Sequence, residues 1–376
     1  MFTARSYTRL VLKIGSSLLV DDHGRLNQPW LSSLAADIAE LSAAGKELVI
    51  VSSGAIVLGR SQLGLPKSGN RLHEQQAAAA VGQIRLSTGW HNALQEVGLV
   101  TAQILLTSDD TEHRRRYLNA HDTLMTLISR RAVPVVNEND TVATDEIRYG
   151  DNDRLAARVA QMVSADALIL FSDVDGLYDR PPETPGAVHV ETVSAITSQI
   201  EAMAGTATSL HGTGGMATKL MAAKIATAAG CDMFIADGRE LHPLKRLSTG
   251  ALCTRFIGTG SVILARKRWI AGSLRIAGRL KLDAGAVAAL RDGKSLLPIG
   301  VTRVDGDFRR GDTVTLLDTD GTEIARGLCA YDSEEARKII GRKSSEIPTV
   351  LGYSGRNVLV HHDDLAWTVT GKSKEK

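Results

Sequence analysis

The segment His211-Gly212-Thr213-Gly214-Gly215-Met216-Ala217-Thr218-Lys219 is a glycine-rich loop that opens onto a helix-forming run at 220–229. Glycine allows the backbone to approach a ligand closely, and a helix N-terminus presents unpaired N–H groups at the positive end of its dipole. Lys219 adds a full positive charge near the start of the expected helix. We interpret the segment as a phosphate-binding loop, and the rest of the chain as the framework around it.

Two other interpretations of this segment compete with phosphate binding. Residues 212–217 also spell G-x-G-x-x-A, the dinucleotide-binding fingerprint, with Asp237 further along the chain. That fingerprint needs a strand directly before its first glycine, whereas residues 192–210 are small and polar without a β-branched run, so we reject it. The other is a surface loop without a ligand, which this segment alone does not exclude. No Walker A pattern occurs in the chain.

Composition indicates an ordinary globular protein. A chain of 376 residues with 43% apolar residues is expected to form two or three domains. Its net charge of +2 gives no electrostatic reason for tight nucleic-acid binding. The three cysteines are too few and too widely spaced for a disulfide framework or a metal site, so we expect buried, inert thiols. No membrane span or signal peptide is recognisable, which favours a cytoplasmic protein without a membrane partner.

Strands alternate with helices up to about residue 260. Apolar, β-rich runs predict strands at 8–14, 47–51, 100–107, 133–136, 167–171 and 232–236, with a small exposed strand at 144–149. Helical patterns occupy 29–44, 56–63, 72–97, 112–131, 154–162 and 220–229. We expect the long run at 72–97 to break near Gly82 or Gly89. The alternation predicts the α/β class, with a mostly parallel sheet between two layers of helices.

The pattern changes after a basic, aromatic hinge at 266–269. Short β-rich runs follow at 296–301, 313–317, 323–329 and 358–360, separated by Gly/Asp turns. Only one or two short helices, at 284–291 and 333–340, are expected among them. We therefore predict a second, smaller, mainly β domain.

Small polar and charged residues follow the predicted strands of the first domain. The carboxyl ends of parallel strands meet at one edge of an open α/β sheet, where ligands bind. The residues expected there are Lys13, Gly15, Ser53, Asn137, Asp140, Asn152, Asp153, Ser172 and Asp173. Lys13 is unusual, because it interrupts an apolar strand. The alternative is a charge on an edge strand that reaches solvent.

Two lysines at this edge, Lys13 and Lys219, fit phosphoryl transfer, in which cations surround the transferring group. The chain contains no catalytic-triad order, protein-kinase catalytic loop or H-E-x-x-H zinc helix. A carboxylate acceptor would explain the missing base, because a carboxylate is already ionised at neutral pH. We expect the lysines to stabilise charge on the transferring group and Asp153 to hold both lysines in place.

Plainer structural roles compete with these assignments. Asp151 and Asp153 could be N-caps of a helix, and Asn137 and Asn139 could close Asx turns. Ser53 could simply end its strand, and the basic run at 114–116 is expected to be a solvated helix face.

Five motifs stand in order along the chain: Lys13-x-Gly15-Ser16-Ser17, Ser52-Ser53-Gly54-Ala55-Ile56, Asn137-Glu138-Asn139-Asp140, Gly150-Asp151-Asn152-Asp153 and Gly212-Thr213-Gly214-Gly215-Met216. They resemble the motifs of the glutamate 5-kinase family, which belongs to the amino-acid kinase superfamily. The tail, through segments at 266–270, 295–300 and 351–353, resembles the PUA domain of that family. The resemblance implies an amino-acid kinase domain at 1–262, a linker at 263–274 and a PUA domain at 275–376.

The resemblance also implies an activity, which is the ATP-dependent phosphorylation of the L-glutamate γ-carboxylate in the first step of proline biosynthesis. Mg2+ would be held mainly by the ATP phosphates. Catalytic roles fall to Lys13, Lys219 and Asp153, and substrate binding to Ser53, Gly54, Asn137, Asp140 and Asn152. ATP binding falls to Lys13, Gly15, Ser172, Asp173, Thr213, Gly214, Gly215, Met216, Ala217, Thr218 and Lys219.

Further expectations concern regulation and partners. The resemblance implies inhibition by proline at the glutamate site and a homo-oligomer, a dimer or tetramer, built through the kinase domain. Because an acyl phosphate is labile in water, we expect hand-over to a glutamyl-phosphate reductase. One alternative is another superfamily kinase, acting on acetylglutamate, aspartate, carbamate or a nucleotide. The other is an RNA-binding PUA protein, which is less favoured because residues 275–376 mix basic with acidic side chains.

Overall fold

The computed structural model describes residues 2–21, 23–66, 71–142, 151–204, 215–259 and 276–368. The chain divides into two units, Met1–Val262 and Ile263–Lys376, each of which is described by itself. Several predicted features lie outside the described residues. They are the exposed strand at 144–149, Thr213 and Gly214 of the phosphate loop, the hinge at 266–269 and the linker at 263–274.

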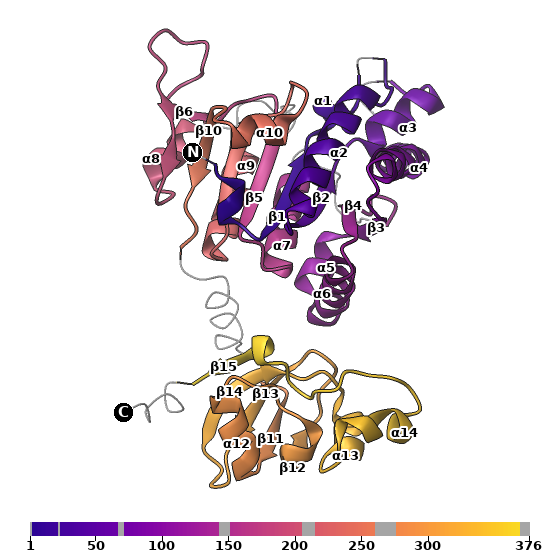
Figure 1. Cartoon of the computed structure of the whole chain (residues 1–376), viewed down its shortest axis with the longest axis vertical. Helices are drawn as coiled ribbons and strands as arrows, with labels where there is room; N and C mark the ends of the chain where they lie inside the picture. Colours follow the sequence, from indigo (N-terminus) through magenta and orange to yellow (C-terminus); the bar gives the residue numbers. More distant parts are fainter. Residues whose placement is uncertain are drawn as a thin grey trace. The chain divides into compact units, whose positions relative to one another are not determined.

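Eight strands form the sheet of the first unit, in the order β3-β4-β2-β1-β5-β9-β10-β8 (Figure 1). Their bounds are β1 Arg9–Ile14, β2 Glu47–Ser52, β3 Thr101–Leu106, β4 Val133–Glu138, β5 Ala167–Ser172, β8 Thr192–Val193, β9 Asp232–Asp237 and β10 Cys253–Phe256. Neighbouring strands pair in parallel, except that β10 is antiparallel to β9. The predicted, mostly parallel sheet is confirmed, and β1 lies inside it between β2 and β5.

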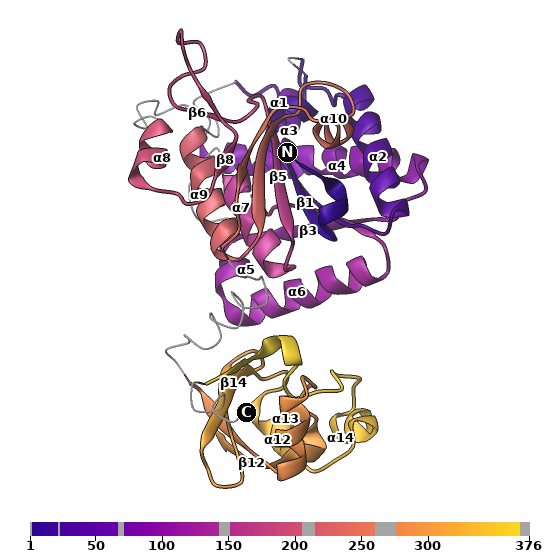
Figure 2. The same ribbon diagram turned by 60° about the vertical axis from the view of Figure 1, so that its left-hand side comes forward.

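Helices cover both faces of this sheet, as predicted for an αβα sandwich (Figure 2). One face packs against α1 Ser16–Leu19, α2 Gln28–Ala43, α3 Ala55–Leu63, α4 Leu72–Glu96 and α10 Pro243–Ser248. The other packs against α6 Arg114–Ser129, α7 Asp151–Met162 and α9 Met216–Ala228. Successive side chains of a strand point to opposite faces, so Leu12 of β1 joins the first core and Val11 the second. By the same alternation Lys13 lies on the face covered by α7 and α9.

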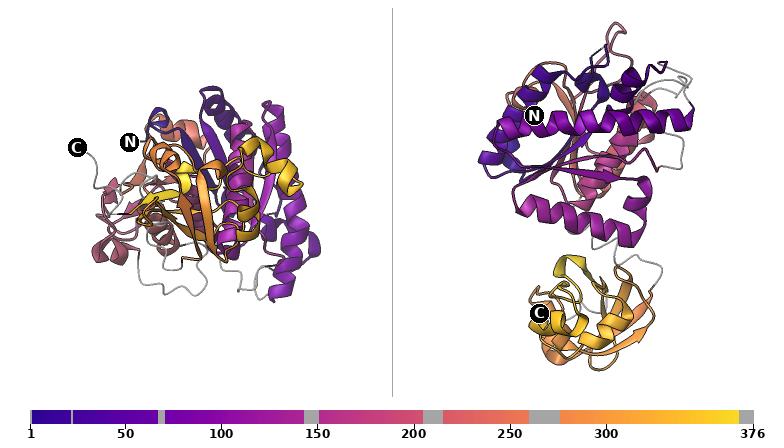
Figure 3. Two further views of the ribbon diagram at one scale, coloured as in Figure 1. Left: turned by 90° about the horizontal axis from the view of Figure 1, so that it is seen from below. Right: turned by 90° about the vertical axis from the view of Figure 1, so that its right-hand side faces the viewer.

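Helix α4 is unbroken, so the expected break near Gly82 or Gly89 is wrong (Figure 3). Close packing against α3, and not a need for backbone flexibility, explains why residue 82 is a glycine. A Cβ built on Gly82 would lie 1.8 Å from the carbonyl oxygen of Ala55, and one built on Gly59 of α3 would lie 1.8 Å from the carbonyl oxygen of Ala78. The two helices therefore cross with their backbones in contact, which only glycine permits at both positions.

The sequence interpretation misses several short elements of the first unit. The missed strands are β8, β10 and the pair β6 Leu177–Tyr178 and β7 His189–Val190. The missed helices are α1, α5 Ser108–Glu112, α8 Ser198–Met203 and α10. Three of these strands contain only two residues, which is too short to leave a period-two pattern in the sequence. The expectation of no strand within 192–210 is therefore wrong for β8.

A five-stranded sheet forms the second unit, in the order β12-β11-β13-β14-β15. Its strands are β11 Gly278–Leu282, β12 Val301–Gly306, β13 Thr313–Leu317, β14 Glu323–Leu328 and β15 Leu365–Trp367, and its helices are α12 Ala284–Arg291, α13 Ser333–Ile339 and α14 Ile347–Leu351. The mainly β architecture is confirmed, but the sequence interpretation misses β11, β15 and the third helix, α14. The strands expected at 296–301 and 358–360 are wrong, because Leu296 and Val360 form only an isolated bridge. Both residues are buried, so their apolar runs serve the core without forming a ladder.

The three cysteines are buried, as the sequence predicts. Cys231, Cys253 and Cys329 are buried and free. Burial raises the pKa of each thiol, that of Cys329 to about 12, so all three are poor nucleophiles at neutral pH. Within the part of the chain that the structure describes, no helix has the length and apolarity needed to span a membrane.

The helix crossing yields a stability prediction. Gly82→Ala places a methyl group where the Ala55 carbonyl lies, so we expect the first unit to lose at least about 2 kcal/mol of unfolding free energy, or roughly 4–8 °C in Tm. Gly285→Ala in α12 is the matched control, because its Cβ would meet nothing closer than 3.4 Å. Thermal unfolding measures both variants, and an unchanged Tm for Gly82→Ala would contradict the close crossing.

Candidate functional site

The side chains of Lys13, Asp153 and Lys219 meet at the carboxyl end of β1. Lys13 Nζ lies 2.6 Å from Asp153 Oδ1, and Lys219 Nζ lies 3.3 Å from Asp153 Oδ2. The three residues are 8%, 0% and 4% exposed, so water solvates their charges poorly. One carboxylate thus bridges two ammonium groups, and the cluster keeps a net positive charge.

The surroundings shift the pKa values of Asp153 and Lys13. Burial alone would raise the pKa of Asp153, but the two ammonium groups outweigh burial and hold it below its usual value. Burial lowers the pKa of Lys13, Asp153 opposes that shift, and the like charge of Lys219 adds to it. Asp153 is therefore ionised at neutral pH with each oxygen against a lysine, which makes it a counter-ion and not a proton acceptor.

Three elements of the first unit bring this cluster together. Lys13 pairs in the sheet with Val51 of β2 and Leu170 of β5, so the edge-strand alternative for Lys13 is wrong. Asp153 lies in the first turn of α7, where a negative charge also complements the helix dipole. Lys219 lies in the first turn of α9, which packs into the same core as α7.

The N-terminus of α9 lies beside the lysine cluster. Gly215 is its N-cap and has no side chain with which to cap the first turn. The Thr218 hydroxyl lies 2.8 Å from the Gly215 carbonyl oxygen and 3.3 Å from Asp153 Oδ2, which ties this turn to the cluster. Met216 and Ala217 are half-buried beside it. The positive end of a 13-residue helix thus adds to the positive charge of the two lysines.

Residues after β1 and β5 lie at the same edge of the sheet. The Gly15 N–H donates to the Phe171 carbonyl oxygen at 3.3 Å. The Ser172 hydroxyl donates to Asp173 Oδ1 at 2.9 Å. Asp173 is exposed, and its charge is among those that act on Lys13. The structure therefore brings the described residues of the predicted nucleotide site to one edge.

Ser53 and Gly54 form the turn between β2 and α3. Gly54 has φ +106°, in the left-handed region, and is the N-cap of α3. A Cβ there would also lie 3.3 Å from Val20, so glycine suits both the conformation and the space. The buried Ser52 hydroxyl accepts a 2.9 Å hydrogen bond from Trp90 Nε1, which fixes the end of β2 next to the half-buried Ser53.

Asn137, Asp140 and Asn152 supply polar atoms at the ends of β4 and α7. Asn137 is 2% exposed, and its Nδ2 donates to Gln83 Oε1 at 2.8 Å. Asp140 is buried in the turn after β4. Asn152 Oδ1 is buried and has no hydrogen-bond partner among the described residues. Leaving such an oxygen unpaired costs about 1–3 kcal/mol, which a ligand that donates a hydrogen bond would recover.

Gln83 is a residue of this region that the sequence interpretation misses. It lies on α4 next to Gly82, at the crossing with α3. It is distant from Asn137 in sequence and follows no strand, so the strand-end rule did not find it. The available signal was Gly82 itself, because a glycine within an Ala-rich helix indicates a close contact with a neighbouring backbone.

The structure supports some of the plainer structural roles considered for these residues and not others. Asp153 does more than cap α7, because it pairs with two lysines; the side chain of Asp151 lies outside the described part. Asn139 accepts a 2.6 Å hydrogen bond from the Thr141 hydroxyl, so a local turn role fits Asn139 but not Asn137. Arg115 and Arg116 are exposed, as expected for a solvated helix face.

The arrangement suits a ligand that carries several negative charges. The cluster is positive and nearly dry, so its field on a phosphate is screened little by water. The asparagine and aspartate oxygens nearby can accept hydrogen bonds from a ligand ammonium group. The geometry thus places a buried positive cluster and a group of polar side chains at the same edge of the sheet.

Comparison with known proteins agrees with this geometry. The sequence profile described as "Amino acid kinase family" matches residues 8–237, and that described as "PUA domain" matches residues 278–351. Glutamate 5-kinase 1 of Rhizobium meliloti (strain 1021) is 57% identical over 364 residues, covering 96% of this chain and 93% of that protein. Glutamate 5-kinase of Rhodopseudomonas palustris (strain BisB5) is 57% identical over 361 residues, covering 96% of both chains.

The charge cluster yields a prediction on stability. Asp153→Asn leaves two buried ammonium groups without a counter-ion, so we expect the first unit to lose about 3–5 kcal/mol of unfolding free energy. Urea unfolding followed by the fluorescence of the buried Trp30 and Trp90 measures this loss.

The double variant Asp153→Asn, Lys219→Met is the diagnostic control. Removing one ammonium group should restore part of the lost stability, and Lys219→Met alone completes the double-mutant cycle. A double variant that is less stable than Asp153→Asn would show that the lysines do not depend on this carboxylate.

Proposed function

The chain belongs to the glutamate 5-kinases of the amino acid kinase family, and on that basis we propose that it transfers the γ-phosphoryl group of ATP to the γ-carboxylate of L-glutamate. The observation that carries this proposal is the buried Lys13–Asp153–Lys219 cluster at the carboxyl end of β1. The product would be L-glutamyl 5-phosphate, in the first step of proline biosynthesis.

The lysines would stabilise the transferring group. Charge spreads over the equatorial oxygens of a transferring phosphoryl group, and preorganised cations in a dry site lower the barrier. Lys13 and Lys219 are held in place before any ligand binds, because Asp153 contacts both ammonium groups. Reorganisation during the reaction is therefore small.

The carboxylate acceptor accounts for the absence of a base in this mechanism. A glutamate γ-carboxylate has a reference pKa of about 4.3, so it attacks phosphorus without losing a proton. Asp153 need not accept a proton, because the two lysines hold its pKa below its usual value. Its assigned role is to position Lys13 and Lys219.

Glutamate would bind among Ser53, Gly54, Asn137, Asp140 and Asn152. Asp140 and Asn152 Oδ1 are acceptors suited to the α-ammonium group, and Asn152 Oδ1 is the buried oxygen that lacks a partner among the described residues. Gln83 would position Asn137, because it accepts the hydrogen bond from Asn137 Nδ2.

ATP would bind at the N-terminus of α9 and the ends of β1 and β5. The residues assigned to it are Lys13, Gly15, Ser172, Asp173, Gly215, Met216, Ala217, Thr218 and Lys219, together with Thr213 and Gly214 from the sequence motif. Mg2+ on the nucleotide supplies further positive charge at the phosphate oxygens. Both oxygens of Asp153 contact lysines, which fits a Mg2+ held mainly by ATP phosphates and not by this carboxylate.

Regulation and partners complete the proposal. Proline would inhibit by occupying the glutamate site, and a homo-oligomer would form through the first unit. The acyl phosphate is labile in water, which favours transfer to a glutamyl-phosphate reductase. Because ATP is the proposed phosphoryl donor, we place the enzyme in the cytoplasm.

ADP release from ATP and Mg2+ tests the acceptor. We expect turnover with L-glutamate, inhibition by L-proline, and none with N-acetylglutamate, L-aspartate or UMP. Lys219→Ala is the control for chemistry, because it should lower kcat by more than about tenfold, roughly 1.4 kcal/mol of barrier, while glutamate still binds. Activity with another acceptor would reject glutamate and leave the lysine assignment intact.

Steady-state kinetics of Gln83→Ala test the glutamate pocket. Loss of the Gln83–Asn137 hydrogen bond, worth about 1 kcal/mol, should raise the KM for glutamate roughly fivefold and leave the KM for ATP nearly unchanged. Gln83→Glu keeps an acceptor oxygen for Asn137 and should restore most of the affinity. Equal increases in both KM values would point to general damage instead.

A further inference from the structure

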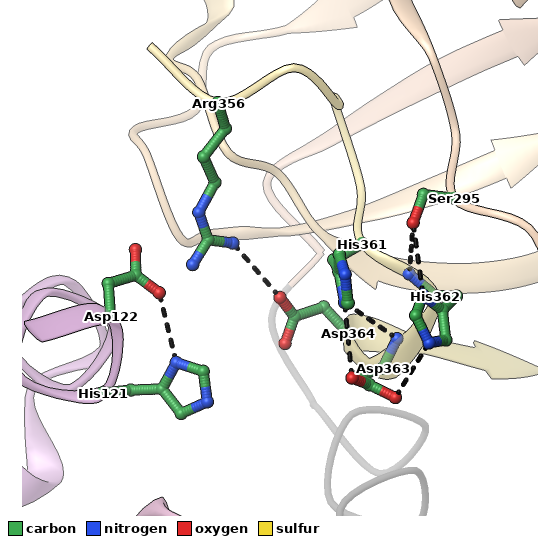
Figure 4. A network of polar contacts seen from close by, with 8 residues as sticks. All are labelled: His121, Asp122, Ser295, Arg356, His361, His362, Asp363 and Asp364. Atoms are coloured by element: carbon green, nitrogen blue, oxygen red, sulfur yellow. Dashed lines mark hydrogen bonds and ion pairs between the residues drawn. The ribbon is translucent and has the colours of Figure 1, made fainter. Parts of the chain in front are cut away.

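A cluster of metal-ligating side chains lies in the second unit, apart from the proposed reaction. His361, His362 and Asp363 follow one another in the turn between the Val360 bridge and β15. Figure 4 shows the two imidazoles and the Asp363 carboxylate close together. One ligand atom from each of the three lies within 4.8 Å of the others. Two nitrogens and a carboxylate oxygen are a donor set that Zn2+ and related ions prefer.

The Asp363 carboxylate lies at a ligand-like spacing from each ring, through a different oxygen for each ring. His361 Nδ1 lies 3.4 Å from Asp363 Oδ2, and His362 Nε2 lies 3.4 Å from Asp363 Oδ1. Ligands about 2.0–2.2 Å from a tetrahedral ion are roughly 3.3–3.6 Å apart. The carboxylate therefore needs little movement to share an ion with both rings.

A hydrogen bond shows the protonation state of His361 Nδ1. The Asp363 backbone N–H donates to His361 Nδ1 at 3.3 Å, so this nitrogen is unprotonated, which is the form that binds a metal ion. An ion would take the lone pair that this long hydrogen bond now uses. The 3.4 Å contact of His361 Nδ1 with a carboxylate oxygen thus brings two electron-rich atoms together. A cation between them would remove that repulsion.

Neighbouring residues hold His362 and its turn. Ser295 Oγ lies 3.3 Å from His362 Nδ1 and accepts a 3.1 Å hydrogen bond from the His362 backbone N–H. This leaves Nε2 as the nitrogen that faces Asp363. The buried Asp364, 3.5 Å from Arg356, anchors the end of the turn. Such contacts behind a ligating histidine fix the ring orientation and strengthen metal binding.

We propose that His361, His362 and Asp363 bind one divalent transition-metal ion of the Zn2+ class, with water completing its coordination. The side chains are 39–50% exposed, so the ion would exchange with solvent. Imidazole ligands favour Zn2+ over Mg2+, which prefers oxygen ligands, so the site discriminates against the nucleotide's cation. The ion stabilises the second unit by binding only its folded form.

Isothermal titration calorimetry with ZnCl2 tests the site in the full chain, prepared without a polyhistidine tag and free of nucleotide and chelator. We expect one Zn2+ site that His362→Ala and Asp363→Asn each weaken at least tenfold. Ser295→Ala should weaken it by about tenfold, since it removes only the support behind His362. His91→Ala is the matched control, an exposed histidine of α4 that should leave binding unchanged.

Thermal unfolding of each variant without metal establishes that it is folded, and Zn2+ should raise the Tm of the second unit only where binding persists. Excess Mg2+ should not displace the ion. Absence of the site in the unaltered chain, or equal Zn2+ binding by His362→Ala, Asp363→Asn and His91→Ala, would overturn the proposal. Displacement by Mg2+ at similar concentrations would overturn the assignment to the Zn2+ class.

Discussion

The structure of the first unit depends on one carboxylate between two lysines. Two buried ammonium groups repel each other and lose most of their hydration, so each needs a counter-ion within contact distance. Asp153 provides it to both Lys13 and Lys219. The cluster can therefore exist only where β1, α7 and α9 meet, so the packing of these three elements also assembles a buried positive centre.

The parallel sheet makes this meeting possible. Its central strand carries Lys13, and its neighbours end at the same level, which gathers the polar residues that follow β2, β4 and β5. The crossing of α3 and α4 positions one more residue of the site. Gly59 and Gly82 let α3 and α4 touch, and that contact sets Gln83 against Asn137. Residues with no polar role thus decide where polar side chains lie.

Much of this could be predicted from sequence, and the exceptions have physical causes. Apolar runs predict the long strands because buried parallel strands are apolar throughout, and the same rule makes Lys13 conspicuous. The two-residue strands leave no periodicity, and α4 looks broken because a packing glycine resembles a hinge in sequence. Leu296 and Val360 resemble strands because burial, and not pairing, dictates their apolar character. Gln83 is found only once α4 is placed against β4.

The occupied oxygens of Asp153 also constrain which reactions the site can catalyse. A hydroxyl acceptor would need a base to take its proton, but Asp153 is held ionised by two lysines and its pKa is lowered, so it is a weak base. Moving a proton onto it would also remove the counter-ion from Lys13 and Lys219. An acceptor that is already an anion avoids both costs, and its negative charge is attracted by the positive cluster of Lys13 and Lys219. The arrangement of charges in this cluster therefore favours a carboxylate over an alcohol as the phosphoryl acceptor.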